Sequence, residues 1–160
     1  MVAYQFHTQY EQGKRAEAFL DRYFSRWFMV DPIPIRREKA EGFDRIFTRR
    51  SNHEQLKIEY KADWTAAVSG NAFLETVSVD CEYKAGWVYT SQADVLVYFV
   101  PPHGIIHMLS LTSLRALLPS WRLRFREVAA PNDGYNTRGL LVPLAQFGKY
   151  AVKRMVEPQT

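Results

Sequence analysis

The chain has 160 residues, of which 47% are apolar and 14% aromatic, enough to fill one hydrophobic core and too many for an intrinsically disordered chain. Its single cysteine, Cys81, excludes an internal disulfide and a zinc site with several cysteine ligands, and it favours the reducing cytoplasm. No apolar run is long enough to span a membrane, and residues 1–5 lack the features of a signal peptide. We therefore expect one cytoplasmic domain over residues 1–160, without membrane contact.

The formal net charge of +4 suits an anionic partner but does not identify one, because many proteins with such an excess never bind nucleic acid. Function must therefore be sought in the placement of individual charged residues.

Apolar residues at helical spacing predict a core-facing helix over residues 11–28. The apolar stripe consists of Ala16, Phe19, Leu20, Tyr23, Phe24, Trp27 and Phe28. Glu17 projects into this stripe rather than opposite it. Either it lies at the edge of the stripe and reaches water, or its charge is paired or bound to a metal ion, as buried carboxylates usually are.

Two prolines, Pro32 and Pro34, end this helix and predict an edge strand or an extended connection. Residues 36–39, which carry four charged side chains, are expected to form a solvated turn.

Alternation of polar and apolar residues predicts a β-hairpin, with strands at residues 43–50 and 55–63 and a loop at 51–54. In the second strand Leu56, Ile58, Tyr60 and Ala62 face a core, which leaves Glu59, Lys61 and Asp63 on the opposite face.

The hairpin register decides which charged residues meet. If Arg50 faces Gln55, Asp44 lies directly across from Lys61 and diagonally from Glu59, about 7 Å away at Cα. One cation about 2.1 Å from each carboxylate could bridge that gap. A slip of one residue would move Asp44 to the core side and remove the arrangement.

Further strands are expected at residues 72–79, 95–100 and 105–109, of which 95–100 is apolar on both faces and belongs in the middle of a sheet. In the strand at 72–79, Glu75 either interrupts a core face or is exposed while its even-numbered neighbours are buried. Thr112 or Ser113 caps a short helix that Pro119 ends, and Arg122, Arg124 and Arg126 form one face of a strand. A last helix is expected over residues 142–155.

The charged face of the hairpin suits phosphodiester hydrolysis. That reaction requires a cation to polarise the phosphoryl oxygen and to lower the pKa of a water molecule, together with a cationic group for the developing charge. Asp44 and Glu59 would hold Mg²⁺ or Mn²⁺, the carbonyl of Tyr60 could complete the shell, and Lys61 would orient or help to deprotonate the water.

These residues resemble the PD-(D/E)XK nucleases, which have the restriction-endonuclease-like fold. The match is an acidic residue on one strand, Asp44, followed by Glu59-Tyr60-Lys61 as the E-x-K of its hairpin partner. Phe43 stands where the family motif is named for a proline. The core of the family, a helix, three strands, a helix and a further strand, is similar to the order expected for residues 11 to 100.

The resemblance implies an α/β (α+β) fold with a central mixed β-sheet flanked by helices, in which an N-terminal helix precedes the hairpin that carries the site. It also implies that Asp44 and Glu59 are metal ligands, that Lys61 is the catalytic lysine, and that Glu17 is the first-helix acid of many members. The expected activity is that of a Mg²⁺- or Mn²⁺-dependent nuclease that acts on nucleic acid, with DNA favoured over RNA.

Two alternatives stay open. The same fold could serve as a nucleic-acid-binding or protein-interaction module that cleaves nothing, or the charged residues could be the soluble strand face of an unrelated α+β domain. The oligomeric state is open as well, with a homodimer among the options.

Overall fold

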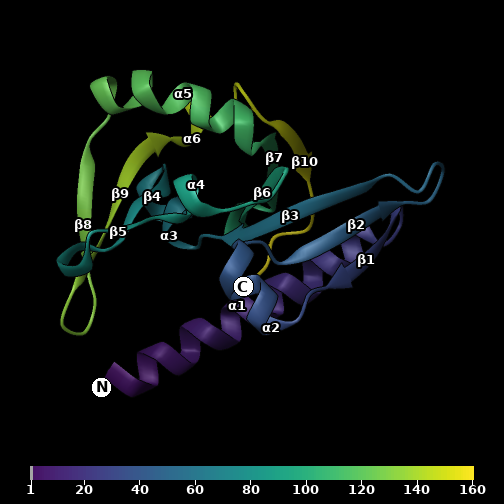
Figure 1. The fold of residues 1–160 in the computed structure, drawn as a ribbon, viewed down its shortest axis with the longest axis horizontal. Coiled ribbons are helices and arrows are strands. Elements are labelled where there is room, and N and C mark those ends of the chain that lie inside the picture. The colour runs from purple at the N-terminus through teal and green to yellow at the C-terminus, as the bar shows by residue number, and fades with distance from the viewer. Residues whose placement is uncertain (1) are drawn as a thin grey trace.

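The described part of the chain forms two β-sheets, six α-helices and two short 3-10 helices at Asp80–Glu82 and Pro101–His103 (Figure 1). The computed structural model describes the backbone of residues 2–160 and the side chains from residue 8 onward. The helices are α1 (Val2–Phe24), α2 (Ile35–Glu41), α3 (Thr65–Ser69), α4 (Trp87–Thr90), α5 (Leu111–Arg124) and α6 (Leu144–Phe147). Among the described residues, no helix is long and apolar enough to cross a membrane.

The central sheet contains, in spatial order, β1 (Phe28–Pro32), β2 (Arg45–Arg49), β3 (Gln55–Ala62), β6 (Val95–Val100), β7 (Ile105–Ser110) and β10 (Val152–Met155). The neighbours β3 and β6 are parallel, and the other pairs are antiparallel. The second sheet has the order β5 (Lys84–Ala85), β4 (Asn71–Val79), β9 (Asn136–Pro143) and β8 (Glu127–Pro131). A mixed central sheet flanked by helices confirms the predicted α/β class at this level.

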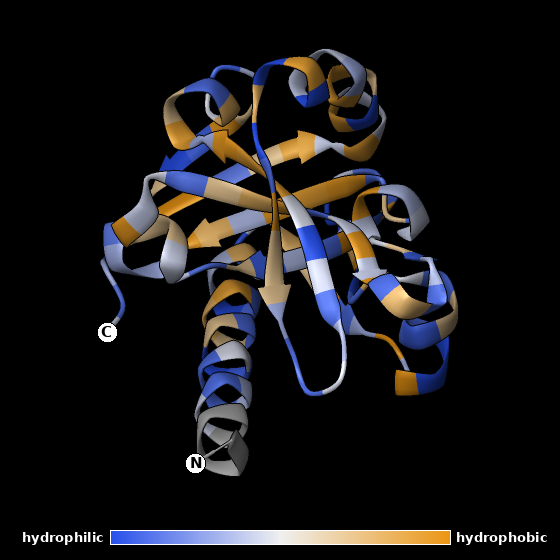
Figure 2. Ribbon diagram, turned by 90° about the vertical axis from the view of Figure 1, so that its left-hand side faces the viewer, coloured by the Kyte–Doolittle hydropathy of each residue, from blue (hydrophilic) through white to orange (hydrophobic). Residues whose placement is uncertain are grey.

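One face of the central sheet is covered by α1. The buried residues Ala16, Leu20 and Phe24 of this helix pack on Phe47, Ile58 and other side chains of the sheet. Figure 2 shows apolar colour on the central strands and mixed colour along α1, part of which projects beyond the sheets. The helix therefore buries one stripe, as its spacing predicts.

The other face of the central sheet shares a core with the second sheet. Leu96, Tyr98 and Val100 of β6 belong to one cluster with Leu74 of β4 and with the buried side of α5. Because β4 lies in the chain between β3 and β6, the parallel connection between these two strands passes through the second sheet. The face of β3 that carries the candidate site is thus partly covered.

Helix α1 ends at Phe24, four residues before the predicted end. The chain turns at residues 25–27, and Phe28 begins β1, where its ring packs on Phe47 with centroids 5.1 Å apart. Phe28 thus reaches the same core from a strand, which explains why the helical spacing continued too far. β1 is an edge strand, as the prolines predict, but residues 36–39 belong to α2 rather than to a turn.

Four predictions for the C-terminal third are wrong. Ser110, rather than Thr112 or Ser113, caps α5, because its hydroxyl accepts the N–H of Ser113. Pro119 lies inside α5, because burial of Leu118 and Trp121 on either side of it outweighs the lost hydrogen bond. Arg122 and Arg124 are therefore helical, and Arg126 directly precedes β8. The predicted helix over 142–155 is instead the end of β9, the single turn α6 and the strand β10.

Candidate active site

The hairpin of β2 and β3 forms in a register two residues away from the predicted one. Thr48 pairs with Gln55 and Arg45 with Ile58, and Asp44, just before β2, bonds to Ile58 and Tyr60, the neighbours of Glu59, rather than facing Lys61. The strands end earlier because His53, with φ of 59°, donates its N–H to the carbonyl of Arg49 and closes a longer loop. A shift of two keeps every side chain on its predicted face. Asp44 lies near enough to Glu59 to raise the pKa of that carboxyl.

Main-chain contacts position Asp44 just before β2. Its N–H donates to the carbonyl of Ile58 at 2.8 Å, and its Oδ2 accepts the N–H of Tyr60 at 2.7 Å. The preceding turn uses Gly42 in the left-handed region, with φ of 63°, and the hydroxyl of Ser91 donates to the Gly42 carbonyl. Gly42 suits this position because a left-handed backbone strains other residues.

Glu59 and Lys61 project from the face of β3 that turns away from α1. Glu59 is buried, with only 4% of its surface exposed, and its Oε1 lies 2.6 Å from Nζ of Lys61. Burial raises the pKa of Glu59 to about 7, since the lowering by Lys61 is only partial and Asp44 raises it further. Burial also raises the pKa of Asp44, against the opposing effect of Lys61.

Lys61 is a cation at neutral pH. Burial acts to lower its pKa, but the attraction of Glu59 and Asp44 outweighs burial and the net pKa is raised. The predicted trio of Asp44, Glu59 and Lys61 is thus one coupled electrostatic group in the structure.

Glu17 takes part in a different network. Its carboxylate binds Nη2 of Arg45 at 3.1 Å and Nζ of Lys14 at 3.2 Å, while Arg45 also binds Asp21. Both options from the sequence hold in part, because Glu17 is paired with Arg45 and Lys14 while 28% of its side chain is exposed. Glu17 still lies near enough to Asp44 to raise the pKa of that carboxyl, so it borders the predicted site.

Two further acidic residues lie near the site: Glu38, for which no role was predicted from the sequence, and Glu75, whose burial the sequence left open. Glu38 of α2, predicted as part of a solvated turn, is half-buried, and its pKa is raised by burial and then by Asp44. The signal for it was present, because Pro34 and Gly42 bracket a run of helix-forming residues. Glu75 of β4 is half-buried while Leu74 and Thr76 are buried behind it. The pKa of Glu75 is raised, because the effect of burial outweighs the lowering by Lys61.

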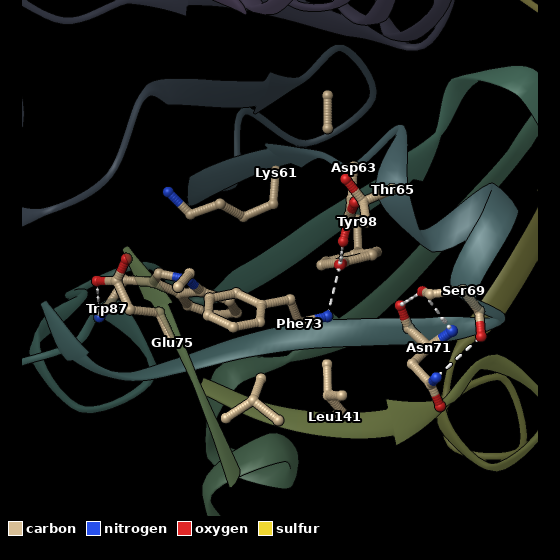
Figure 3. Close-up of a pocket in the computed structure, with 13 residues that line it drawn as sticks. Lys61, Asp63, Thr65, Ser69, Asn71, Phe73, Glu75, Trp87, Tyr98 and Leu141 are labelled. Carbon is tan, nitrogen blue, oxygen red and sulfur yellow. Dashed lines mark hydrogen bonds between the residues drawn. The ribbon is translucent and has the colours of Figure 1, made fainter. Parts of the chain in front are cut away.

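A cavity of about 530 Å³ opens beside Lys61, between β3 and the second sheet. Figure 3 shows Lys61 and Asp63 on one side of it and Phe73 and Glu75 of β4 on the other. Asp63 has a structural role here, because its carboxylate accepts the N–H of Ala66 at 2.9 Å and the hydroxyl of Tyr98. Lys61 is therefore shared between the predicted site and a cavity with walls from both sheets.

The oxygen atoms available to bind a cation at the predicted site come from two carboxylates and one main-chain carbonyl. Among the described residues, no group of three or more His, Cys, Asp and Glu side chains could hold a metal ion. Asp44 and Glu59 are a pair of hard oxygen donors, and the carbonyl of Tyr60 leaves β3 on the same edge as the N–H that binds Asp44. Such a set fits Mg²⁺, which commonly takes one or two protein carboxylates and fills its shell with water and substrate phosphate.

A comparison with protein-family models, curated proteins and solved structures finds no match for this chain.

Proposed function

We propose that the protein is a Mg²⁺- or Mn²⁺-dependent nuclease with a restriction-endonuclease-like core, which hydrolyses phosphodiester bonds in nucleic acid. The observation that carries this proposal is the position of Asp44 beside Glu59: its main chain and side chain bond to Ile58 and Tyr60 on either side of Glu59, and the ammonium of Lys61 lies 2.6 Å from Glu59. Two carboxylates whose pKa values are both raised are an arrangement that a bound divalent cation would stabilise.

The order of the elements supports the same proposal. A long helix precedes three strands of one sheet, Asp44 lies at the start of the second, and Glu59-Tyr60-Lys61 lies in the third. A further strand, β6, then pairs with that third strand. This order resembles that of the PD-(D/E)XK core, with two departures: α2 separates the first two strands, and the second sheet takes the place of a long crossover helix.

Each residue has a separable role in the proposed reaction. Asp44, Glu59 and the Tyr60 carbonyl would hold the cation, which when bound supplies a polarised phosphoryl oxygen and a more acidic water. Lys61, being protonated, would donate to a phosphoryl oxygen and stabilise the charge that develops there rather than remove a proton. A protonated lysine has no lone pair to accept a proton from the water, so the raised pKa argues against the deprotonating role for Lys61.

The experiment is incubation of plasmid DNA, single-stranded DNA and RNA with the wild-type protein in Mg²⁺, Mn²⁺ or EDTA. We expect cleavage that requires the divalent cation, and a loss of at least about a hundredfold in rate for Asp44→Asn and Lys61→Met. Lys57→Met is the matched control, because Lys57 lies on the same face of β3 but pairs with Glu41 at 3.7 Å.

Cleavage that persists in Asp44→Asn and Lys61→Met would show that the activity comes from elsewhere or from a contaminant. If no substrate is cleaved but nucleic acid is bound, the protein is a binding module and the nuclease proposal is wrong.

A further inference from the structure

We infer that the cavity beside Lys61 takes the base of a single unpaired nucleotide, so that the substrate is a nucleic acid with an unpaired residue next to the cleaved bond. This inference rests on the proposed nuclease function for the position of the phosphate. It adds a binding site that the acidic residues and Lys61 do not themselves define.

The walls of the cavity suit a planar, largely apolar group. Phe73, Trp87 and Tyr98 contribute aromatic surface, and Val128, Ala130 and Leu141 contribute aliphatic surface. The tip of the Phe73 ring fills the space above Gly139, where an added Cβ would come within 2.4 Å of the ring. Gly139 thus lets Phe73 lie along the second sheet as one wall. Aromatic walls of this kind stack bases of any sequence.

The size of the cavity fits one nucleotide rather than a duplex. About 530 Å³ is within the range of pockets that enclose a small organic ligand. A base inside a continuous double helix cannot enter such a space unless it leaves its stack.

Charge decides which part of the nucleotide enters. Asp63 and Glu75 line the cavity, and among the residues that the structure describes Lys61 is the only basic one that does so. A phosphate deep in the cavity would meet two carboxylates, whereas a neutral base would not be repelled. The phosphate must then stay at the Lys61 end, next to the proposed cation site, where Glu59 binds Lys61 and Asp44 is near enough to raise the pKa of Lys61.

The cavity can be filled without touching the acidic residues. Ala130 and Ala129 are consecutive residues of β8, and Ala130 lines the cavity whereas Ala129 is exposed on the other face of the strand. Ala130→Phe should fill the cavity, and Ala129→Phe is a control with the same change in size. Circular dichroism melting of both variants establishes that each is folded.

Binding is measured by fluorescence polarisation of a labelled six-thymidine oligonucleotide in EDTA, so that no cleavage is required. We expect Ala130→Phe to weaken binding at least about tenfold, Ala129→Phe to leave it unchanged, and an abasic analogue at one position to weaken binding to the wild type by a similar factor. With Mg²⁺, a duplex with one unpaired nucleotide should be cleaved faster than the fully paired duplex.

The two proposals fail differently. Equal binding by Ala130→Phe and wild type, equal cleavage of the two duplexes, or no binding of the oligonucleotide at all would each overturn the inference about the cavity. Cavity-dependent binding without cleavage under any condition would uphold the cavity and overturn the nuclease.

Discussion

Replacement of Glu59 by glutamine should change how the stability of the protein depends on pH. The pKa of Glu59 is raised from 4.5 to about 7 in the folded protein, mainly by burial. Between these two values the folded protein holds a proton on Glu59 that the unfolded chain releases, so the free energy of unfolding falls as the pH rises. The difference between the two pKa values corresponds to about 3 kcal/mol of stability at low pH, and this stability is lost once the pH exceeds the pKa in the folded protein.

The assay is urea unfolding at a series of pH values from 4 to about 8.5, with the free energy of unfolding of Glu59→Gln subtracted from that of the wild type. We expect this difference to fall by about 3 kcal/mol between pH 4.5 and about 7 and to be level above that range. Glu54→Gln is the control, because the Glu54 side chain is 53% exposed in the hairpin loop.

Addition of Mg²⁺ gives a second arm. At a free concentration of 100 times the dissociation constant, binding to the ionised pair should stabilise the wild type by about 2.7 kcal/mol at pH 8, and Glu59→Gln much less. A wild-type difference curve that is flat from pH 4 to about 8 would refute the argument that burial raises the pKa of Glu59.

Three further substitutions test the scaffold, each read as a change in the free energy of unfolding. Arg45→Met should destabilise by about 2–3 kcal/mol, because Arg45 is 8% exposed and its loss leaves the partly exposed Asp21 and Glu17 without their shared cation. Gly139→Ala should cost about 1–3 kcal/mol, since its Cβ would come within 2.4 Å of the Phe73 ring. Ser110→Ala should cost about 1 kcal/mol, because its hydroxyl caps α5 by accepting the N–H of Ser113 at 3.0 Å.

A second glycine substitution is the control for Gly139→Ala. Gly13→Ala, in a helical position with no atom within 4 Å of the added Cβ, should stabilise the protein by about 0.5–1 kcal/mol. Unchanged stability in Gly139→Ala would mean that the Phe73 ring moves freely, and an unaffected Arg45→Met would mean that water solvates Asp21 and Glu17 in the folded state.

The hairpin could be predicted from sequence because its two faces differ. Alternation assigned Ile58 and Tyr60 to the core under α1 and Glu59 and Lys61 to the opposite face, and the structure confirms both assignments. The register could not be fixed in this way, because a shift of two residues preserves every face. The conformation of His53 in the loop decided it.

Environment was harder to predict than orientation. Alternation does not show what covers the opposite face of β3, and Glu59 is buried there because the chain between β3 and β6 forms part of a second sheet. Such long-range contacts leave no periodic signal near residue 59. In the C-terminal third, Pro119 was predicted to end a helix, as proline usually does. The helix continues through it because tertiary contacts bury Trp121.

The anchoring of Asp44 also bears on how the site could be re-engineered. The N–H of Asp44 donates to the carbonyl of Ile58. The carbonyl of Asp44 accepts the N–H of Ile33 at 3.4 Å and a hydrogen bond from Nη1 of Arg45 at 3.0 Å. These contacts hold the backbone at position 44 whatever side chain it carries. A designer could therefore exchange the ligand type there, for example for a histidine that favours softer metals, and keep the direction from which the ligand approaches.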